Sequence, residues 1–229
     1  MKAFTARELT TAVCAICPEI ESRIAGNFGA TSERRLWWEL SACLLSSQVP
    51  YMLAANAASA IEAEGVLYDR NCQEDLTERL IAILKRPNGG RSYRFPVARA
   101  RQLAATKRRV SEQFGTLGSL LATSESPYAM RDWLVEMAPG FGPKQASMFL
   151  RNTGVSYDLA ILDRHVLDYM RLIGLRTAQS KPLTTMKRYR CDELSMCDHA
   201  RALGFPVGIL DWAIWIVMRV ANKQEGTRI

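Results

Sequence analysis

Residues 139–154 read PGFGPKQASMFLRNTG, and this is the most informative stretch of the chain. A helical pattern ends near Met137, and Gly140 and Gly142 permit positive φ in a tight hairpin. Pro143 suits the first position of a new helix, where its missing N–H costs nothing. Apolar residues at positions 146, 149 and 150 give that helix one buried face, and a glycine at 154 ends it. The stretch therefore predicts a helix–hairpin–helix.

A hairpin of this kind is suited to hold a phosphate group. Glycines leave the backbone N–H groups at the start of the second helix open to approach, and the helix dipole favours an anion there. We therefore expect Gly140 and Gly142 to bind the DNA backbone. The same pattern also fits an ordinary hairpin between two packed helices, so the glycines alone leave both interpretations open.

Lys144 lies in the first turn of the second helix, where a cation opposes the helix dipole. The same field disfavours the charged ammonium form, and a lysine that loses its proton is a competent amine nucleophile. A residue that breaks a local rule is a candidate for function. The alternative is a surface lysine that contacts a phosphate.

A second run, residues 159–167, reads LAILDRHVL, and its apolar part ends at Asp163. A helical pattern begins just after this aspartate, so Asp163 is predicted to be an N-cap. A carboxylate fixed at a helix start can also stabilise a developing oxocarbenium ion. The two roles are compatible, and the cap alone would explain the position of Asp163.

Lys144 followed by Asp163 resembles the helix–hairpin–helix DNA glycosylase superfamily, in which such a lysine and aspartate are the catalytic pair. The patterns K-x-A-S-x-F-L-R-N from residue 144 and D-R-H from residue 163 are most similar to the small 8-oxoguanine DNA glycosylases of archaea and some bacteria. The resemblance implies a bifunctional glycosylase/AP lyase that flips 8-oxoguanine out of double-stranded DNA. Lys144 would form a Schiff base, Asp163 would stabilise the sugar cation, and no cofactor would be needed.

The resemblance extends to two segments before the hairpin. LLSSQ at 44–48 is similar to the family segment whose polar residue fills the gap left by the flipped base, although Gln48 would also fit a polar cap ahead of Pro50. YRFP at 93–96, followed by Arg99, is similar to a second family segment, and we expect Arg94 and Arg99 to bind DNA. Further cations of this basic helix are expected to be mainly solvated: Arg101, Lys107, Arg108 and Arg109.

Residues near and after the hairpin complete the expected site. His165 is expected to meet a phosphate, or else to be a surface group at a helix start. Trp212 and Trp215, in a segment LDWAIW that also matches the family, are candidates to wall the base pocket together with Met148. The alternative for the tryptophans is a place in the core of the last helix, where residues i and i+3 share a face.

Apolar residues recur at spacings of three and four along most of the chain, which predicts an all-α fold of about ten helices. Ser32 is expected to cap one helix, and residues 87–90, PNGG, to end another. We expect two helical lobes with a DNA-binding cleft between them: 31–127, a six-helix-barrel-like lobe, and 1–30 with 128–229. The hairpin region, 137–154, is assigned to the second lobe, with the first as an alternative.

Composition agrees with this interpretation. The 229 residues carry a net charge of +7, which suits a polyanionic partner. Six cysteines supply only one tight pair, Cys14 and Cys17, so we expect no metal site. Residues 1–8 lack an apolar run and 209–221 are too short to span a bilayer, so we expect no signal peptide, no membrane contact and a cytoplasmic, nucleoid-associated monomer.

Two features depart from the small glycosylases: the chain continues through residues 222–229, and residues 180–197 are unusually basic and polar. They leave the identity of the excised base open. The competing interpretations are a glycosylase for another damaged or modified base, a non-catalytic helix–hairpin–helix DNA-binding protein, and a helical scaffold. A module that only binds DNA has no need of Asp163.

Overall fold

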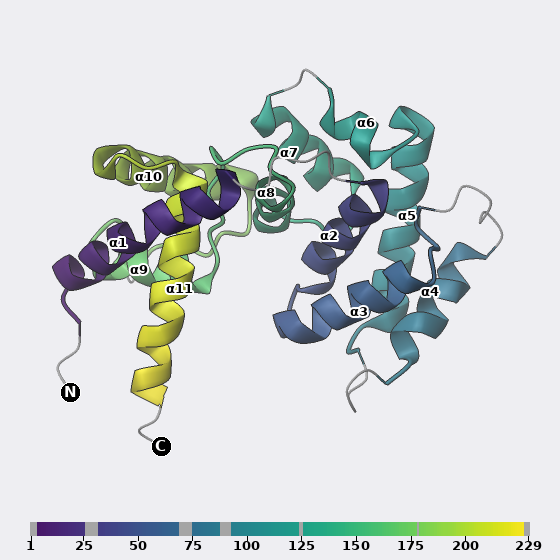
Figure 1. Cartoon of the computed structure of the whole chain (residues 1–229), viewed down its shortest axis with the longest axis horizontal. Coiled ribbons are helices and arrows are strands. Elements are labelled where there is room, and N and C mark those ends of the chain that lie inside the picture. The colour runs from purple at the N-terminus through teal and green to yellow at the C-terminus, as the bar shows by residue number, and fades with distance from the viewer. Residues whose placement is uncertain are drawn as a thin grey trace. The chain divides into compact units, whose positions relative to one another are not determined.

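The computed structural model describes residues 4–25, 32–68, 75–87, 93–123, 126–177 and 179–226, and within these ranges all regular structure is helical (Figure 1). The predicted all-α class is therefore confirmed. Most of the turn predicted at 87–90 lies outside the described residues. The helices are α1 (Ala6–Ala25), α2 (Glu33–Leu45), α3 (Tyr51–Ala63), α4 (Leu76–Lys85), α5 (Pro96–Phe114), α6 (Leu117–Leu121), α7 (Pro127–Met137), α8 (Pro143–Asn152), α9 (Arg164–Leu172), α10 (Met186–Leu203) and α11 (Val207–Gly226).

The chain forms two compact units, which we call the middle unit (residues 30–155) and the terminal unit (residues 1–29 with 156–229). The hairpin and α8 belong to the middle unit, which is the second of the two assignments considered above. The physical reason is that α8 packs on α2, and the Asn152 side chain donates to the buried Glu39 carboxylate at 2.6 Å.

Helix α2 is the centre of the middle unit and packs against α3, α5, α6 and α8. Its cap is the predicted one, since Ser32 Oγ accepts from the Arg35 N–H at 3.3 Å. Glu33 then joins α2 to α6: its carboxylate accepts from the Trp37 indole at 2.8 Å and from the Leu117 and Gly118 N–H groups at 2.8 and 2.9 Å. One side chain thus satisfies two N–H groups at the start of α6.

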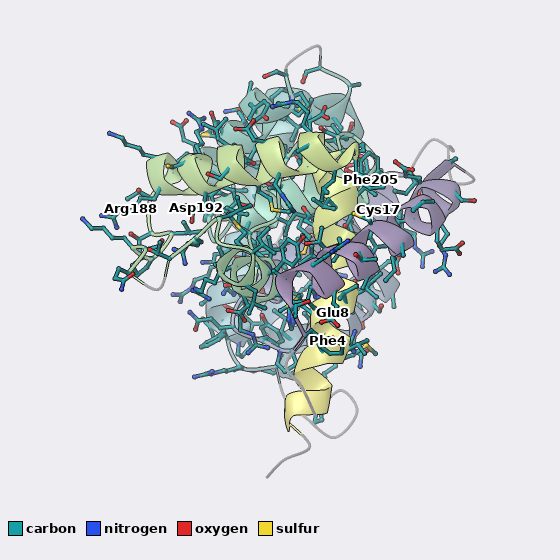
Figure 2. All side chains as sticks on the ribbon, turned by 90° about the vertical axis from the view of Figure 1, so that its left-hand side faces the viewer. Phe4, Glu8, Cys17, Arg188, Asp192 and Phe205 are labelled. Carbon is teal, nitrogen blue, oxygen red and sulfur yellow. The ribbon has the colours of Figure 1, made fainter. Side chains whose placement is uncertain are left out.

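The terminal unit packs α1, α9 and α10 around α11, and α1 follows the predicted helical spacing through Leu9, Val13 and Ile20. Cys17, labelled in Figure 2, is fully buried beside them, and its thiol donates to the Val13 carbonyl at 3.4 Å. It is a small core residue, the usual role of a buried thiol. The core residues of the other helices include Val166, Met170, Met196, Ala200, Leu210, Ala213 and Ile214.

The unusually basic segment, residues 180–197, is an irregular connection followed by the first part of α10. Buried Arg176 fastens it, with Nε donating to Asp192 at 2.7 Å and Nη2 donating to the Lys181 carbonyl at 2.6 Å (Figure 2 labels Asp192). Lys187, Arg188 and Arg190 face solvent instead. No single helix in the described ranges is long and apolar enough to cross a membrane; α10 and α11 meet that test only as a pair, which is bent by 92°.

Replacing Glu33 by Ala should lower the free energy of unfolding by about 2–4 kcal/mol, because three donors lose a charged acceptor. Urea denaturation of the variant measures this change. Glu112→Ala on the exposed face of α5 is the control and should alter stability by less than about 0.5 kcal/mol. Equal effects of the two substitutions would show that Glu33 does not link α2 to α6.

Candidate active site

The predicted helix–hairpin–helix is present as α7, residues 138–142 and α8. Gly140 has φ +88°, as the hairpin requires, and the Phe141 N–H closes the turn on the Ala138 carbonyl at 3.0 Å. Gly142 differs from the prediction, since its φ of −104° is open to any residue. Its contribution is the lack of a side chain at the N-cap of α8, so no capping group occupies the N–H groups that would face an anion.

Helix α5 supports this hairpin through two side chains, Arg109 and Gln102. The Arg109 guanidinium donates to the Met137 carbonyl at 2.6 Å, which places a cation at the C-terminus of α7. A side chain on Gly140 would overlap Gln102, because an added Cβ would lie 2.6 Å from Gln102 Cδ. The expectation that Arg109 is mainly solvated is wrong, since the open carbonyls at the end of α7 recruit it. Lys107, also expected in solvent, lies over the Trp37 ring at 5.2 Å.

Lys144 is the second residue of α8 and is half-buried. Met148 is also half-buried and lies one turn further along the same face, in reach of the lysine side chain. The lysine also reaches α2 electrostatically. Burial, and next the charge of Glu39, raise the pKa of the Cys43 thiol well above its usual range, while Lys144 and Arg151 act in the opposite direction.

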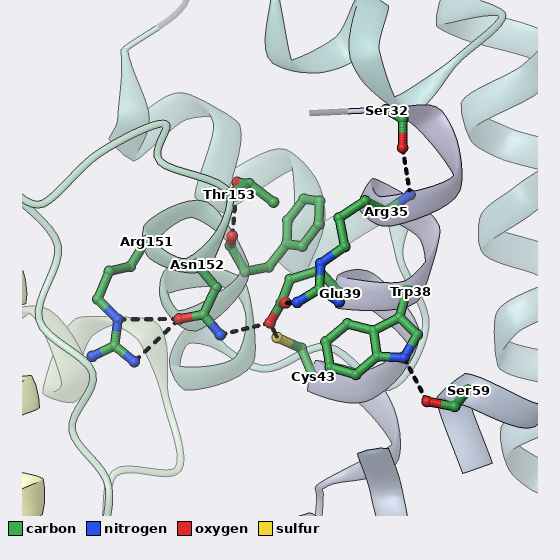
Figure 3. Close-up of polar contacts among 10 residues, drawn as sticks. Ser32, Arg35, Trp38, Glu39, Cys43, Ser59, Arg151, Asn152 and Thr153 are labelled. Carbon is green, nitrogen blue, oxygen red and sulfur yellow. Dashed lines mark hydrogen bonds and ion pairs between the residues drawn. The ribbon is translucent and has the colours of Figure 1, made fainter. Parts of the chain in front are cut away.

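A polar network fixes the far end of α8 on α2 (Figure 3). Glu39 is 5% exposed and accepts from Asn152 at 2.6 Å and from the Cys43 thiol at 3.8 Å. Asn152 in turn accepts twice from Arg151, at 3.2 Å. The sequence prediction missed Glu39, although a signal was present: the carboxylate stands next to Leu40 and three residues after Leu36, on the apolar face of its helix.

Gln48 lies in the turn between α2 and α3, exposed and with φ +61°. A left-handed conformation is strained for a residue with a side chain, and such strain often marks a functional position. The alternative role as a cap is not observed, since α3 begins after Pro50 without a side-chain cap. Two side chains brace the turn: Tyr93 donates to the Leu45 carbonyl at 2.7 Å and Arg99 donates to the Ser47 carbonyl at 3.4 Å.

The two arginines expected to bind DNA differ in their surroundings. Arg94 is exposed, and its guanidinium lies over the Phe95 ring at 4.8 Å. Arg99 is half-buried and binds protein oxygens, the Ser47 carbonyl and the Gln102 side chain. Of the two, Arg94 is therefore the more exposed to solvent.

Asp163 caps α9 as predicted, with Oδ1 accepting from the Val166 N–H at 2.9 Å. The irregular segment before it, residues 159–162, is buried, and the sequence prediction missed what holds this segment. Tyr189 accepts from the Leu162 N–H at 3.1 Å and donates to the Ala160 carbonyl at 2.7 Å. Three buried side chains accept from the segment's N–H groups and so set the position of Asp163: Tyr189, Glu193 (Ala160 N–H, 3.1 Å) and Asp211 (Ile161 N–H, 2.8 Å).

The structure separates the roles of the two tryptophans. Trp215 is half-buried and stands edge-to-face against His165, with ring centroids 6.5 Å apart. Trp212 packs against the core of the terminal unit. Trp215 therefore lies beside His165, which follows Asp163 by two residues. Trp212 instead has the core position named as its alternative.

The expected catalytic pair comes from both units, Lys144 from the middle unit and Asp163 from the terminal unit. The contacts given above fix α8, which carries Lys144, within the middle unit and Asp163 within the terminal unit. Among the described residues no three His, Cys, Asp or Glu side chains gather where they could hold a metal ion.

A family model described as 8-oxoguanine DNA glycosylase matches residues 21–205. The chain is 32% identical over 188 residues to the 8-oxoguanine DNA glycosylase/AP lyase of Thermoplasma volcanium, with 82% of each chain covered. It is also 32% identical over 188 residues to the enzyme of the same name from Thermotoga petrophila, again with 82% of each chain covered.

Solved structures agree. The 8-oxoguanine DNA glycosylase of Thermotoga maritima matches with a TM-score of 0.68 and 32% identity, covering 92% of this chain and 93% of that one. The 8-oxoguanine glycosylase/lyase of Methanocaldococcus jannaschii, solved in complex with a 15mer DNA containing 8-oxoguanine, matches with a TM-score of 0.64 and 25% identity, covering 86% and 88%.

Tyr189→Phe should lower the free energy of unfolding by about 1–3 kcal/mol, because a buried N–H and a buried carbonyl both lose their partner. Chemical denaturation checks this value. Tyr51→Phe, at an exposed side chain, is the control and should change stability by less than about 0.5 kcal/mol. If Tyr189→Phe left the free energy of unfolding unchanged, the Tyr189 hydroxyl would not be one of the groups that hold the Asp163 segment.

Proposed function

The chain belongs to the family of 8-oxoguanine DNA glycosylases, and from this membership we propose that it is a bifunctional DNA glycosylase/AP lyase. It removes 8-oxoguanine from double-stranded DNA and then cuts the strand. The observation that carries the proposal is Lys144 in the first turn of α8, directly after the Gly140 hairpin. A cation at this end of a helix costs stability, so a functional reason is needed for its presence.

Binding begins at the hairpin. The N–H groups at the start of α8 hold a backbone phosphate, helped by the helix dipole. The damaged nucleotide then leaves the stack, because its glycosidic bond is out of reach inside a duplex. Gln48 fills the vacated space, a role supported by its exposure and by the strained conformation in which it is held. Arg94 contacts the DNA from the same unit.

The reaction uses Lys144 and Asp163. The Lys144 amine attacks C1′ of the sugar while the bond from C1′ to the base breaks, and the base leaves with the bonding electrons and is protonated. Asp163 stabilises the positive charge that develops on the sugar. Ring opening gives an iminium between Lys144 and C1′, loss of a C2′ proton follows, and the 3′ phosphate departs by β-elimination.

Aromatic and flexible side chains form the surroundings of the flipped base in this proposal. Trp215 supplies an aromatic face, and its contact with His165 ties it to the residue proposed to meet a phosphate. Met148 lies beside Lys144 and is adaptable enough to pack against a purine. Trp212 packs against the core of the terminal unit and contributes to the site only through that packing.

We further propose that the protein acts as a cytoplasmic monomer at the nucleoid. Every group named in the reaction comes from one chain, so a second copy is not required, and the substrate is genomic DNA. The competing functions are excision of another damaged base and DNA binding without catalysis. The three functions predict different covalent adducts. The proposal predicts an adduct with DNA that contains 8-oxoguanine, the first alternative predicts an adduct with another lesion, and the second predicts none.

Borohydride should trap the wild-type protein on duplex DNA that contains 8-oxoguanine, because reduction of the iminium gives a stable amine. Lys144→Gln should abolish the adduct. Asp163→Asn should keep the α9 cap, since the amide oxygen still accepts from the Val166 N–H, but excision should slow by at least roughly 100-fold. Gel electrophoresis measures both the adduct and the strand cut.

The controls separate the alternatives. Arg151→Gln, on the same helix as Lys144, should still form the adduct. An adduct with other lesions but none with 8-oxoguanine would show that the substrate is a different damaged base. No adduct with any lesion would indicate a protein that binds DNA without catalysis. A full adduct in Lys144→Gln would assign the nucleophile to another residue.

Gln48→Gly tests separately the backbone strain at residue 48 and the proposed role of the Gln48 side chain in excision. Glycine accepts φ +61° freely, so the variant should be as stable as the wild type or up to about 1 kcal/mol more stable, while excision should fall roughly 10-fold. Thermal denaturation and single-turnover excision measure the two effects. Asp75→Gly, at the other described non-glycine position with positive φ, should leave excision unchanged; equal loss in both variants would contradict a role for Gln48.

A further inference from the structure

One face of α5 carries four residues at helical spacing, Arg99, Gln102, Thr106 and Arg109, and three of them contact other segments of the middle unit. Arg109 donates to the Met137 carbonyl where α7 ends. Gln102 packs against Gly140 so closely that a Cβ added at residue 140 would force the Gln102 amide to move. Arg99 reaches the turn that carries Gln48. A single rigid helix thus contacts the hairpin and the Gln48 turn.

The two ends are joined by direct bonds. Arg99 Nη1 donates to Gln102 Oε1 at 2.7 Å, and Arg99 Nη2 donates to the Ser47 carbonyl at 3.4 Å. Arg99 also lies beside the Tyr93 hydroxyl, where its charge and hydrogen bond oppose the rise in the pKa of Tyr93 that burial causes. Tyr93 itself holds the Leu45 carbonyl. A continuous path of contacts therefore runs from Gly140 through Gln102 and Arg99 to the residue before Gln48.

We propose that Arg99 and Gln102 are positioning residues that hold the phosphate-binding hairpin and the Gln48 turn in a fixed relation. DNA anchored at the hairpin then meets Gln48 at the position where the base has left. The inference rests on the proposed function, and it changes the role expected for Arg99 from a phosphate ligand to a brace for strained backbone. Gln102, which no sequence motif marked, becomes part of the same device.

The chemistry of arginine fits this role better than a single positive charge would. The planar guanidinium spans two acceptors, one on each side of the path, and a lysine ammonium at the same place cannot bind both in the same geometry. The opposing interpretation is that Arg99 neutralises a phosphate. One observation favours it: the Arg99 Nε is buried without a hydrogen-bond partner among the described residues, so this donor is not used within the protein. The two roles predict different salt dependence and different effects of Arg99→Lys.

The first test uses the free protein and does not depend on any activity. Hydrogen exchange of the Val49 N–H, which donates to the Ser46 carbonyl at 3.4 Å, reports on the Gln48 turn. Arg99→Ala, Arg99→Lys and Gln102→Leu should each speed this exchange by roughly 5- to 10-fold, the factor expected when one hydrogen bond is lost. Arg101→Ala removes an exposed cation from the same helix and should leave the exchange rate unchanged.

The second test measures binding and excision on duplex DNA containing 8-oxoguanine. Single-turnover excision should fall roughly 10- to 100-fold in Arg99→Ala, Arg99→Lys and Gln102→Leu, as for a misplaced group. The slope of log Kd against log salt should stay at the wild-type value in all three. Because Gln102 is neutral, its effect cannot come from a lost charge. The double variant Arg99→Ala with Gln102→Leu should be no slower than the worse single variant.

The outcomes that overturn the proposal are distinct from failure of the function. A slope that falls by about 0.9 in Arg99→Ala, with Arg99→Lys active, would make Arg99 a phosphate ligand. Unchanged exchange at Val49 in Gln102→Leu would show that no coupling reaches the turn. If the wild type does not excise 8-oxoguanine at all, the proposed function fails, and the exchange measurement alone decides whether Arg99 and Gln102 brace the turn.

Discussion

Backbone outside helices must find hydrogen-bond partners elsewhere in the chain, and this constraint fixes three of the segments on which the proposed function depends. These three segments are the turn at 46–49, the hairpin at 138–142 and the segment at 159–163. Side chains from helices far away in sequence hold them: α5 binds the turn at 46–49 and the Met137 carbonyl just before the hairpin, and α10 with α11 binds the segment at 159–163. The helices thus build the core and also supply the polar groups that keep irregular backbone in place.

Local rules were enough to predict the helices, the caps at Ser32 and Asp163 and the positive φ of Gly140. Each of these depends on neighbours within a few residues, which a sequence pattern records. Gly142 shows the limit even here, because two glycines in a hairpin do not reveal which of them takes the left-handed conformation. The same local stretch carries the most specific part of the resemblance to the family, whose model matches residues 21–205.

The partners of the irregular segments could not be predicted, because they are set by packing. In the sequence Arg109 is one more cation of a basic helix. It caps the C-terminus of α7 only because folding brings it to the Met137 carbonyl. Glu193 and Asp211 are carboxylates on buried helix faces, a signal that marks them as unusual without naming the N–H groups they meet. The boundary between the units has the same cause, since the contact of Asn152 with Glu39 assigns α8 to the middle unit.

The N-cap formed by Asp163 affects which catalytic residue a related chain would keep during evolution if its activity were lost. One oxygen of this carboxylate supports the start of α9, so the residue would be retained for folding even without catalysis. Lys144 has no such second reason, since a cation at the start of α8 weakens the helix. In a lineage that had lost its substrate, drift would remove the lysine first, and an aspartate standing alone would be the remnant of a former enzyme.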